Sequence, residues 1–185
     1  MRKLIMWNMM TLDGCFEGKQ SWDLDFHELG WGPELSRFSI EQLDAADTLL
    51  FGRVTYEGMA QHWSTATGEI ADRMNGIQKV VFSRTLASTD WVNTRLVSTE
   101  AAEEVARLKA QPGKDILVFG SADLCASLIR AGLIDECRIA LNPIVLGEGS
   151  PLFKPGTDQT TMRLLEARPL QTGAVLLRYE PVPAA

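Results

Sequence analysis

Leu49-Leu50-Phe51-Gly52-Arg53-Val54-Thr55-Tyr56-Glu57 is the stretch of this sequence that decides the fold. Its apolar first half predicts a buried parallel strand, and the residues after Gly52 favour a helix. The free N–H groups and positive dipole end of such a helix attract a phosphate. Gly52 lets an anion approach the backbone, Arg53 adds charge-assisted hydrogen bonds, and Thr55 adds a hydroxyl donor. An ordinary strand-to-helix turn with a solvated arginine is the alternative interpretation.

Two further strand ends show a similar pattern, in which a phenylalanine is followed by glycine, serine or arginine. They are Phe82-Ser83-Arg84-Thr85 and Phe119-Gly120-Ser121. In an open α/β sheet, ligands lie outside the carboxyl ends of the strands. If the three strands are neighbours, their loops line one groove with two arginines, several hydroxyl groups and two helix N-termini. That combination suits a phosphorylated dinucleotide, and Arg84 is a sensible ligand for a 2′-phosphate, which favours NADP over NAD. The GxGxxG fingerprint is absent. Taken singly, Ser83-Arg84 can be a plain loop and Gly120-Ser121 a plain helix entry.

Strand and helix signals alternate through most of the chain, which predicts an α/β fold with a mostly parallel central sheet flanked by helices. A C-terminal antiparallel strand pair, 161–168 and 174–180, is expected around Thr172-Gly173. No linker or internal repeat divides the sequence, so we expect a single domain over residues 1–185. The other expected strands cover 3–10, 47–51, 79–82, 116–119 and 138–141, and the expected helices begin at Pro33, after Gly52, near residue 69, at an N-cap Thr99 and at an N-cap Ser121.

Composition excludes several classes of function. The chain has 185 residues, a formal net charge of −6 and no long basic run, which argues against general nucleic-acid binding. No apolar segment has the length of a membrane span. Cys15, Cys125 and Cys137 show no CxxC spacing, which indicates reduced thiols in a cytoplasmic protein. His27 and His62 lie in no metal-binding pattern, so no metal site is expected and neither histidine receives a role.

An ordered series of short motifs runs along nearly the whole chain. The sequence thereby resembles the dihydrofolate reductase-like superfamily, and especially the family of the riboflavin-biosynthesis reductase (RibD C-terminal) domain. The motifs are Thr11-Leu12-Asp13-Gly14, Gly52-Arg53-Val54-Thr55-Tyr56-Glu57, Val81-Phe82-Ser83-Arg84, Val118-Phe119-Gly120-Ser121, Gly132-Leu133-Ile134-Asp135-Glu136, and Pro143-Ile144-Val145-Leu146-Gly147-Glu148-Gly149 followed by Leu152-Phe153.

The resemblance implies that NADPH binds across the carboxyl ends of the strands. By motif match, Gly52, Arg53 and Thr55 contact phosphates, and Ser83 and Arg84 lie near the adenosine 2′-phosphate. The pair Gly120-Ser121 lets the pyrophosphate or the nicotinamide ribose approach the next helix. This chain has Ser121 where the family commonly has a second glycine, which puts the close approach of the backbone in question.

The substrate side of the site depends on two carboxylates. Reduction of a C=N or C=O group by hydride needs a proton source. The resemblance places Asp13 beside the nicotinamide pocket and Glu34 on a helix like the carboxylate-bearing helix of dihydrofolate reductases. A turn residue before a glycine and a favourable charge in the first turn of a helix are the alternatives. The aromatic residues Trp22, Trp31 and Phe38 are candidates for an apolar wall or for the core.

We therefore expect an NADPH-dependent reductase that transfers hydride to a small heterocyclic substrate, pterin-like or pyrimidine-like, with Asp13 or Glu34 near the path of the proton. The alternative is a nucleotide-binding dimeric scaffold of the same fold without turnover. A small heterocycle is the expected partner, and neither nucleic acid nor membrane is. The resemblance also implies a homodimer.

Overall fold

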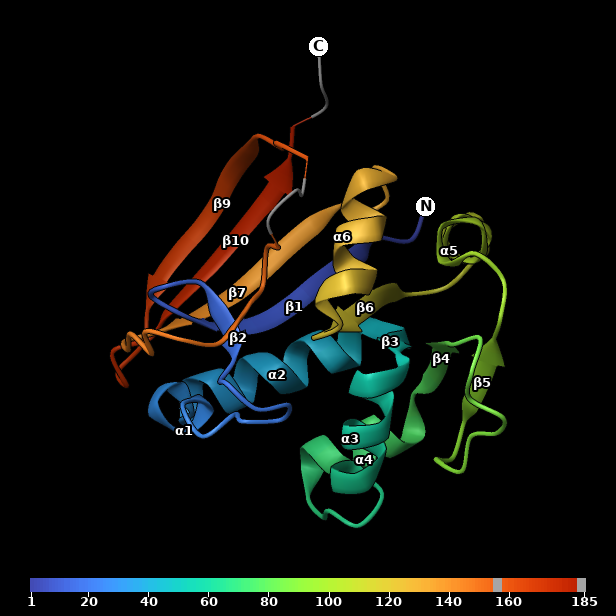
Figure 1. Cartoon of the computed structure of the whole chain (residues 1–185), viewed down its shortest axis with the longest axis horizontal. Helices are drawn as coiled ribbons and strands as arrows, with labels where there is room; N and C mark the ends of the chain where they lie inside the picture. The colour runs from blue at the N-terminus through green and yellow to red at the C-terminus, as the bar shows by residue number, and fades with distance from the viewer. Residues whose placement is uncertain (155–157, 183–185) are drawn as a thin grey trace.

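The computed structural model describes residues 1–154 and 158–182 and has a mixed α/β fold built on an eight-stranded sheet (Figure 1). The strand order is β5-β4-β3-β6-β1-β7-β10-β9. Every neighbouring pair from β5 to β7 is parallel, whereas β10 runs antiparallel to both β7 and β9. This arrangement confirms the predicted parallel sheet with a C-terminal antiparallel pair.

Within the described residues, the predicted strands and helices all occur in the predicted order, together with four short elements that were not predicted. The strands are β1 (Leu4–Thr11), β2 (Cys15–Glu17), β3 (Ala46–Gly52), β4 (Gln78–Phe82), β5 (Thr94–Val97), β6 (Asp115–Phe119), β7 (Glu136–Asn142), β8 (Ser150–Pro151), β9 (Met162–Pro169) and β10 (Val175–Pro181). The helices are α1 (His27–Gly30), α2 (Pro33–Ala45), α3 (Arg53–Trp63), α4 (Glu69–Gly76), α5 (Ala101–Ala110) and α6 (Ala122–Arg130).

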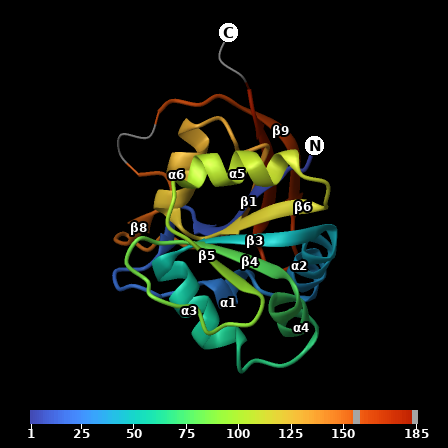
Figure 2. The ribbon, with the colours of Figure 1, turned by 90° about the vertical axis from the view of Figure 1, so that its right-hand side faces the viewer.

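Helices cover both faces of the sheet. Figure 2 shows α5 and α6 on one face and α1, α2, α3 and α4 on the other. In the part of the chain that the structure describes, no helix is long and apolar enough to cross a membrane. The two helical layers bury two apolar cores, one on each side of the sheet.

The interior strand β1 contributes to both cores. Ile5, Trp7 and Met9 face the core under α2 and α3, whereas Leu4 and Met6 face the core under α5 and α6. A strand that is buried on both faces needs apolar residues at nearly every position. This is why an uninterrupted apolar run, and not an alternating one, predicts the centre of a parallel sheet.

Several short or irregular elements differ from the sequence prediction. The edge strand β5, the helix α1 and the small antiparallel pair of β2 with β8 were not predicted. They are four residues long or shorter, and no periodicity can be read from so short a segment. The N-cap of α5 is Glu100 and not Thr99, and the hydroxyl of Ser121 makes no cap bond to its own helix α6.

A buried carboxylate joins the parallel strands to the antiparallel pair. Glu136 begins β7, its side chain is 2% exposed, and its Oε1 accepts hydrogen bonds from Nε of Arg138 and Nε of Arg178, each at 2.8 Å. Arg138 and Arg178 are cross-strand partners in β7 and β10. Burial by itself would raise the pKa of Glu136, but the hydrogen bonds from the two arginines outweigh burial and lower it.

The substitution Glu136→Gln is expected to destabilise the fold by roughly 3 kcal/mol, because it leaves two guanidinium groups without their buried counter-charge. Urea unfolding at pH 7 measures this difference. The matched control is Glu166→Gln, since Glu166 also pairs with Arg178 but its side chain is 31% exposed. The control is expected to lose less than about 1 kcal/mol.

A comparison of the wild type with Glu136→Gln also gives a pH dependence. The pKa of Glu136 is lowered in the folded state. Its ionised carboxylate therefore stabilises the fold above the ordinary carboxylate pKa of about 4.3, and this stabilisation is lost as the pH falls below that value. The free energy of unfolding of the wild type should therefore fall more steeply below this pH than that of Glu136→Gln. Parallel pH profiles for the two proteins would contradict the role assigned to Glu136.

Candidate active site

A cavity of about 500 Å³ lies where the carboxyl ends of the central strands meet the helices α2, α3 and α6. The sheet order places β4, β3 and β6 side by side, so the three strand ends singled out in the sequence are neighbours, which was the condition for a shared groove. The residues that line the cavity include members of β1, α2, α3, the turn after β6 and the start of α6. The cavity is therefore at the position where open α/β sheets bind their ligands.

Two hydrogen bonds connect the turn after β3 with the turn after β6. The Gly52 N–H donates to Oγ of Ser121 at 2.9 Å, and the Ser121 N–H donates to Oγ1 of Thr55 at 3.1 Å. Gly120 and Ser121 both have left-handed backbones, with φ of +53° and +52°. A Cβ on Gly120 would also lie 3.2 Å from Cγ2 of Thr55, so glycine is favoured there by backbone and by space.

Five of the predicted cofactor-binding residues line this cavity together: Gly52, Arg53, Thr55, Gly120 and Ser121. The groups are not all available to a ligand, since the Gly52 N–H and one lone pair of the Thr55 hydroxyl are used between the two turns. The hydroxyl hydrogen of Thr55 and the first-turn N–H groups of α3, which receive no side-chain cap, remain. The Arg53 guanidinium pairs with Glu57 at 2.9 Å, and both side chains are about half exposed.

Ser83 and Arg84 lie at the same edge of the sheet but do not line the cavity. Phe82, which ends β4, is in register with Gly52, which ends β3, so the Ser83-Arg84 turn is one strand further along this edge. Oγ of Ser83 accepts a hydrogen bond from the Leu86 N–H at 2.9 Å. Arg84 pairs with Glu100 on the surface, where its side chain is 72% exposed. Both residues are reachable by a ligand that extends from the cavity along the strand ends.

Asp13 lies outside the cavity, on an exposed turn. Its carboxylate accepts hydrogen bonds from Oγ1 of Thr11 at 2.6 Å, from the Gly147 N–H at 2.8 Å and from the Leu146 N–H at 3.3 Å. These bonds, that of Thr11 first, lower the pKa of Asp13. The carboxylate therefore connects the turn after β1 to the loop before β8 and stays ionised, which is unfavourable for a proton donor.

Glu34 also lies outside the cavity. Its Oε2 accepts a hydrogen bond from the Gln171 N–H at 2.7 Å, which connects the first turn of α2 to the loop between β9 and β10. Both carboxylates that were expected on the proton path therefore hold loops together through hydrogen bonds, and neither of them lines the cavity. The sequence pattern placed them near strand and helix ends but could not show which way each side chain points.

The half of the cavity between β1, α2 and α3 is largely apolar. Trp7, Met9, Trp22, Trp31, Met59 and Trp63 line it. Phe38, a third candidate for this wall beside Trp22 and Trp31, instead packs against Trp7 with ring centroids 5.5 Å apart. Trp22 lies against α3 at Gly58, where an added Cβ would be 1.9 Å from the indole ring. Gly58, an isolated glycine in a helix, is the sequence signal for this close approach.

Three polar side chains at the cavity were missed as site residues. Asn8 and Gln42 are 5% and 3% exposed, and Nδ2 of Asn8, Nε2 of Gln42 and Nε2 of His27 have no hydrogen-bond partner among the described residues. All three residues line the cavity. Burial lowers the pKa of His27 to about 4, so its ring is neutral at physiological pH. A buried polar group without a partner is rare in folded proteins, and a ligand-binding role is one explanation for it.

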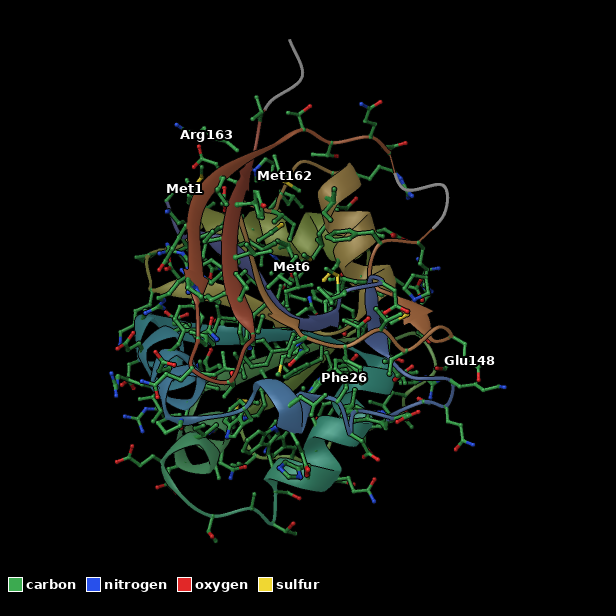
Figure 3. All side chains as sticks on the ribbon, turned by 90° about the vertical axis from the view of Figure 1, so that its left-hand side faces the viewer. Met1, Met6, Phe26, Glu148, Met162 and Arg163 are labelled. Carbon is green, nitrogen blue, oxygen red and sulfur yellow. The ribbon has the colours of Figure 1, made fainter. Side chains whose placement is uncertain are left out.

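Two acidic residues line the cavity, and both have partners. Glu17 accepts hydrogen bonds from the Trp22 N–H at 2.8 Å and from the Ser150 hydroxyl at 3.3 Å, and Asp123 pairs with Lys154 at 2.6 Å. Glu148 is instead at the outer tip of its loop, where it pairs with Lys19 (Figure 3). Within residues 1–154 and 158–182, no group of three or more His, Cys, Asp or Glu side chains could hold a metal ion.

Comparisons with known proteins agree with this architecture. Uncharacterized protein YyaP of Bacillus subtilis (strain 168) is 32% identical over 186 residues, which cover 96% of this chain and 94% of that protein. A solved structure from Shewanella sp. PV-4, whose name places it in riboflavin biosynthesis, matches with a TM-score of 0.79 at 20% identity and covers 98% of this chain and 99% of that chain.

A third protein shares the fold over part of its length. It is a diaminohydroxyphosphoribosylaminopyrimidine deaminase/5-amino-6-(5-phosphoribosylamino)uracil reductase from Thermotoga maritima, with a TM-score of 0.68 at 12% identity, covering 98% of this chain and 57% of that chain. The family model of the RibD C-terminal domain matches residues 2–176. With that match over nearly its whole length, this chain belongs to the RibD C-terminal domain family.

Proposed function

We propose that this protein is a cytoplasmic, NADPH-dependent reductase of a small, flat heterocycle. The observation that carries the proposal is the cavity itself: one end is formed by Arg53, Thr55 and the two strand-end turns, and the other by tryptophan and methionine side chains. An anion-binding end that continues into an apolar pocket suits a phosphorylated cofactor whose flat ring meets a flat substrate. Among the structural neighbours, a reductase of a uracil derivative supports a heterocyclic substrate.

The residues present fit NADPH. The first-turn N–H groups of α3, the Arg53 guanidinium and the Thr55 hydroxyl would hold phosphate oxygens. Gly120 lines the same cavity, and its φ of +53° and the closeness of Thr55 both favour a residue without a side chain there. Arg84, exposed at the end of the neighbouring strand, would hold the 2′-phosphate. Glu57 and Glu100 would then exchange their present arginine partners for solvent.

When bound, NADPH supplies a hydride to the carbon of a C=N or C=O group, and the heteroatom of that group takes up a proton. The apolar wall would exclude water and pack against a flat ring. A proton from Asp13 or Glu34 would have to travel through water, because neither lines the cavity. Among the described residues, Glu17 and His27 are titratable groups that line it on the substrate side.

The proposal is tested by titrating the full chain with NADPH while tryptophan fluorescence is recorded, since four of the five tryptophans line the cavity. We expect saturable quenching or energy transfer in the micromolar range, followed by oxidation of NADPH when a suitable pterin or pyrimidine is added. The absence of any cofactor binding would overturn the proposal.

The second candidate function is a nucleotide-binding scaffold that keeps the fold without turnover. The structural contacts of Asp13 and Glu34 favour it, because they remove the two expected proton donors from the cavity. Binding of NADPH without its oxidation, across a broad panel of pterins, pyrimidines and carbonyl compounds, would support this function instead.

The choice between NADPH and NADH is expected to depend on Arg84. The substitution Arg84→Ala should weaken NADPH binding by roughly tenfold to a hundredfold, the range for a charge-assisted hydrogen bond, and leave NADH binding nearly unchanged. The matched control is Arg163→Ala on β9, because Arg163 is also an exposed arginine that pairs with a glutamate. Isothermal titration calorimetry with both cofactors measures the effect. Equal losses for NADPH and NADH would refute the assignment.

A further inference from the structure

We propose that Gln42 is a specificity-determining residue whose side-chain amide donates a hydrogen bond to a carbonyl oxygen of an uncharged heterocycle in the apolar half of the cavity. This inference rests on the proposed function, because it names the ligand class of the same cavity. It assigns a role to a residue that no motif of the sequence singles out.

The orientation of the Gln42 amide follows from its neighbour. Oε1 of Gln42 accepts a hydrogen bond from Nη1 of Arg138 at 3.4 Å. The reversed orientation would direct the amide N–H groups at a guanidinium, which has only donors to offer. Nε2 therefore faces away from Arg138, and it has no hydrogen-bond partner among the described residues although the side chain is 3% exposed.

Contacts with Glu136 and Phe38 hold the Arg138 side chain in this position. Its Nε donates to Glu136 at 2.8 Å, and its guanidinium lies 5.7 Å from the ring centroid of Phe38 on α2. The chain of contacts from Glu136 through Arg138 to Gln42 polarises the amide and strengthens Nε2 as a donor. Because a buried donor without a partner is unfavourable, a ligand that supplies an acceptor gains affinity at this point.

The charges around the cavity indicate an uncharged ligand at this end. Among the described residues, two cationic side chains line the cavity: Arg53 at the start of α3, and Lys154 in the segment after β8. The half that holds Gln42 presents Trp7, Ser39 and a neutral His27. The guanidinium of Arg138, which contacts Gln42, is already paired with Glu136, so a phosphate or carboxylate placed there would be buried without a counter-charge of its own, which is strongly unfavourable.

The inference is tested by binding of two pteridines of equal size to the full chain without cofactor. Lumazine presents carbonyl oxygens at positions 2 and 4 of the ring, and 2,4-diaminopteridine presents amino groups there. Calorimetric titration at pH 7 should show lumazine binding at least about tenfold more tightly, the difference expected for one buried hydrogen bond. Equal affinities, a preference for the diamino compound, or no binding of either up to about 1 mM would overturn the proposal.

Variants of Gln42 assign the effect to this residue. Gln42→Met removes the donor at similar volume and should abolish the preference for lumazine, whereas Gln42→Glu supplies acceptors and should reverse it. The matched control is Gln61→Met on α3, since Gln61 is exposed and does not line the cavity. Circular dichroism verifies that each variant is folded, and if Gln42→Glu is not, Gln42→Met alone decides. An unchanged preference in Gln42→Met would contradict the role of Gln42.

A second pair of ligands tests the charge. Lumazine-6-carboxamide and lumazine-6-carboxylate have similar shapes, and the uncharged amide should bind at least about tenfold more tightly. Equal or tighter binding of the carboxylate would overturn the expectation of an uncharged ligand. A protein that discriminates among these pteridines but does not bind NADPH would support the role of Gln42 and refute the proposed reductase, so the two failures are distinguishable.

Discussion

The buried carboxylate of Glu136 is the contact on which both halves of this structure depend. Through Arg178 it connects β7 to β10, where the sheet changes from parallel to antiparallel, and through Arg138 it reaches α2 and the Gln42 amide. A single carboxylate with two arginines can lie in an apolar interior only if both hydrogen bonds are kept. The junction between the parallel and antiparallel strands and the orientation of Gln42 at the cavity thus depend on the same charge cluster.

A second constraint holds the strand-end turns in place. Ser121 has a left-handed backbone, which costs a non-glycine residue about 1 kcal/mol, and its hydroxyl and N–H are both used in bonds to the turn after β3. Ser121 therefore has a structural role: its two bonds connect the N-terminus of α6 with that of α3. The anion-binding capacity that remains lies with Arg53, Thr55 and the first turn of α3.

Much of the fold could be predicted from local patterns. The apolar runs of β1, β3, β4 and β6 reveal strands buried on both faces, and Pro33 and Thr172-Gly173 mark a helix start and a hairpin turn that the structure confirms. The edge strand β5 and the short pair of β2 with β8 could not be found, because strands of two to four residues form only where a neighbouring strand supplies hydrogen bonds.

The sequence by itself determined the order of the longer elements, the family resemblance, and the two separate strand-end turns, one with Gly52, Arg53 and Thr55 and one with Gly120 and Ser121, because these follow from residues close together in the chain. The two turns meet because the sheet order makes β3 and β6 neighbours. Only the tertiary structure decided which polar groups meet. Asp13 and Glu34 turn to backbone N–H groups more than 130 residues away, and Gln42 receives its orientation from Arg138, 96 residues further on. The direction of a side chain depends on partners that the sheet order brings to it, and no local pattern contains that information.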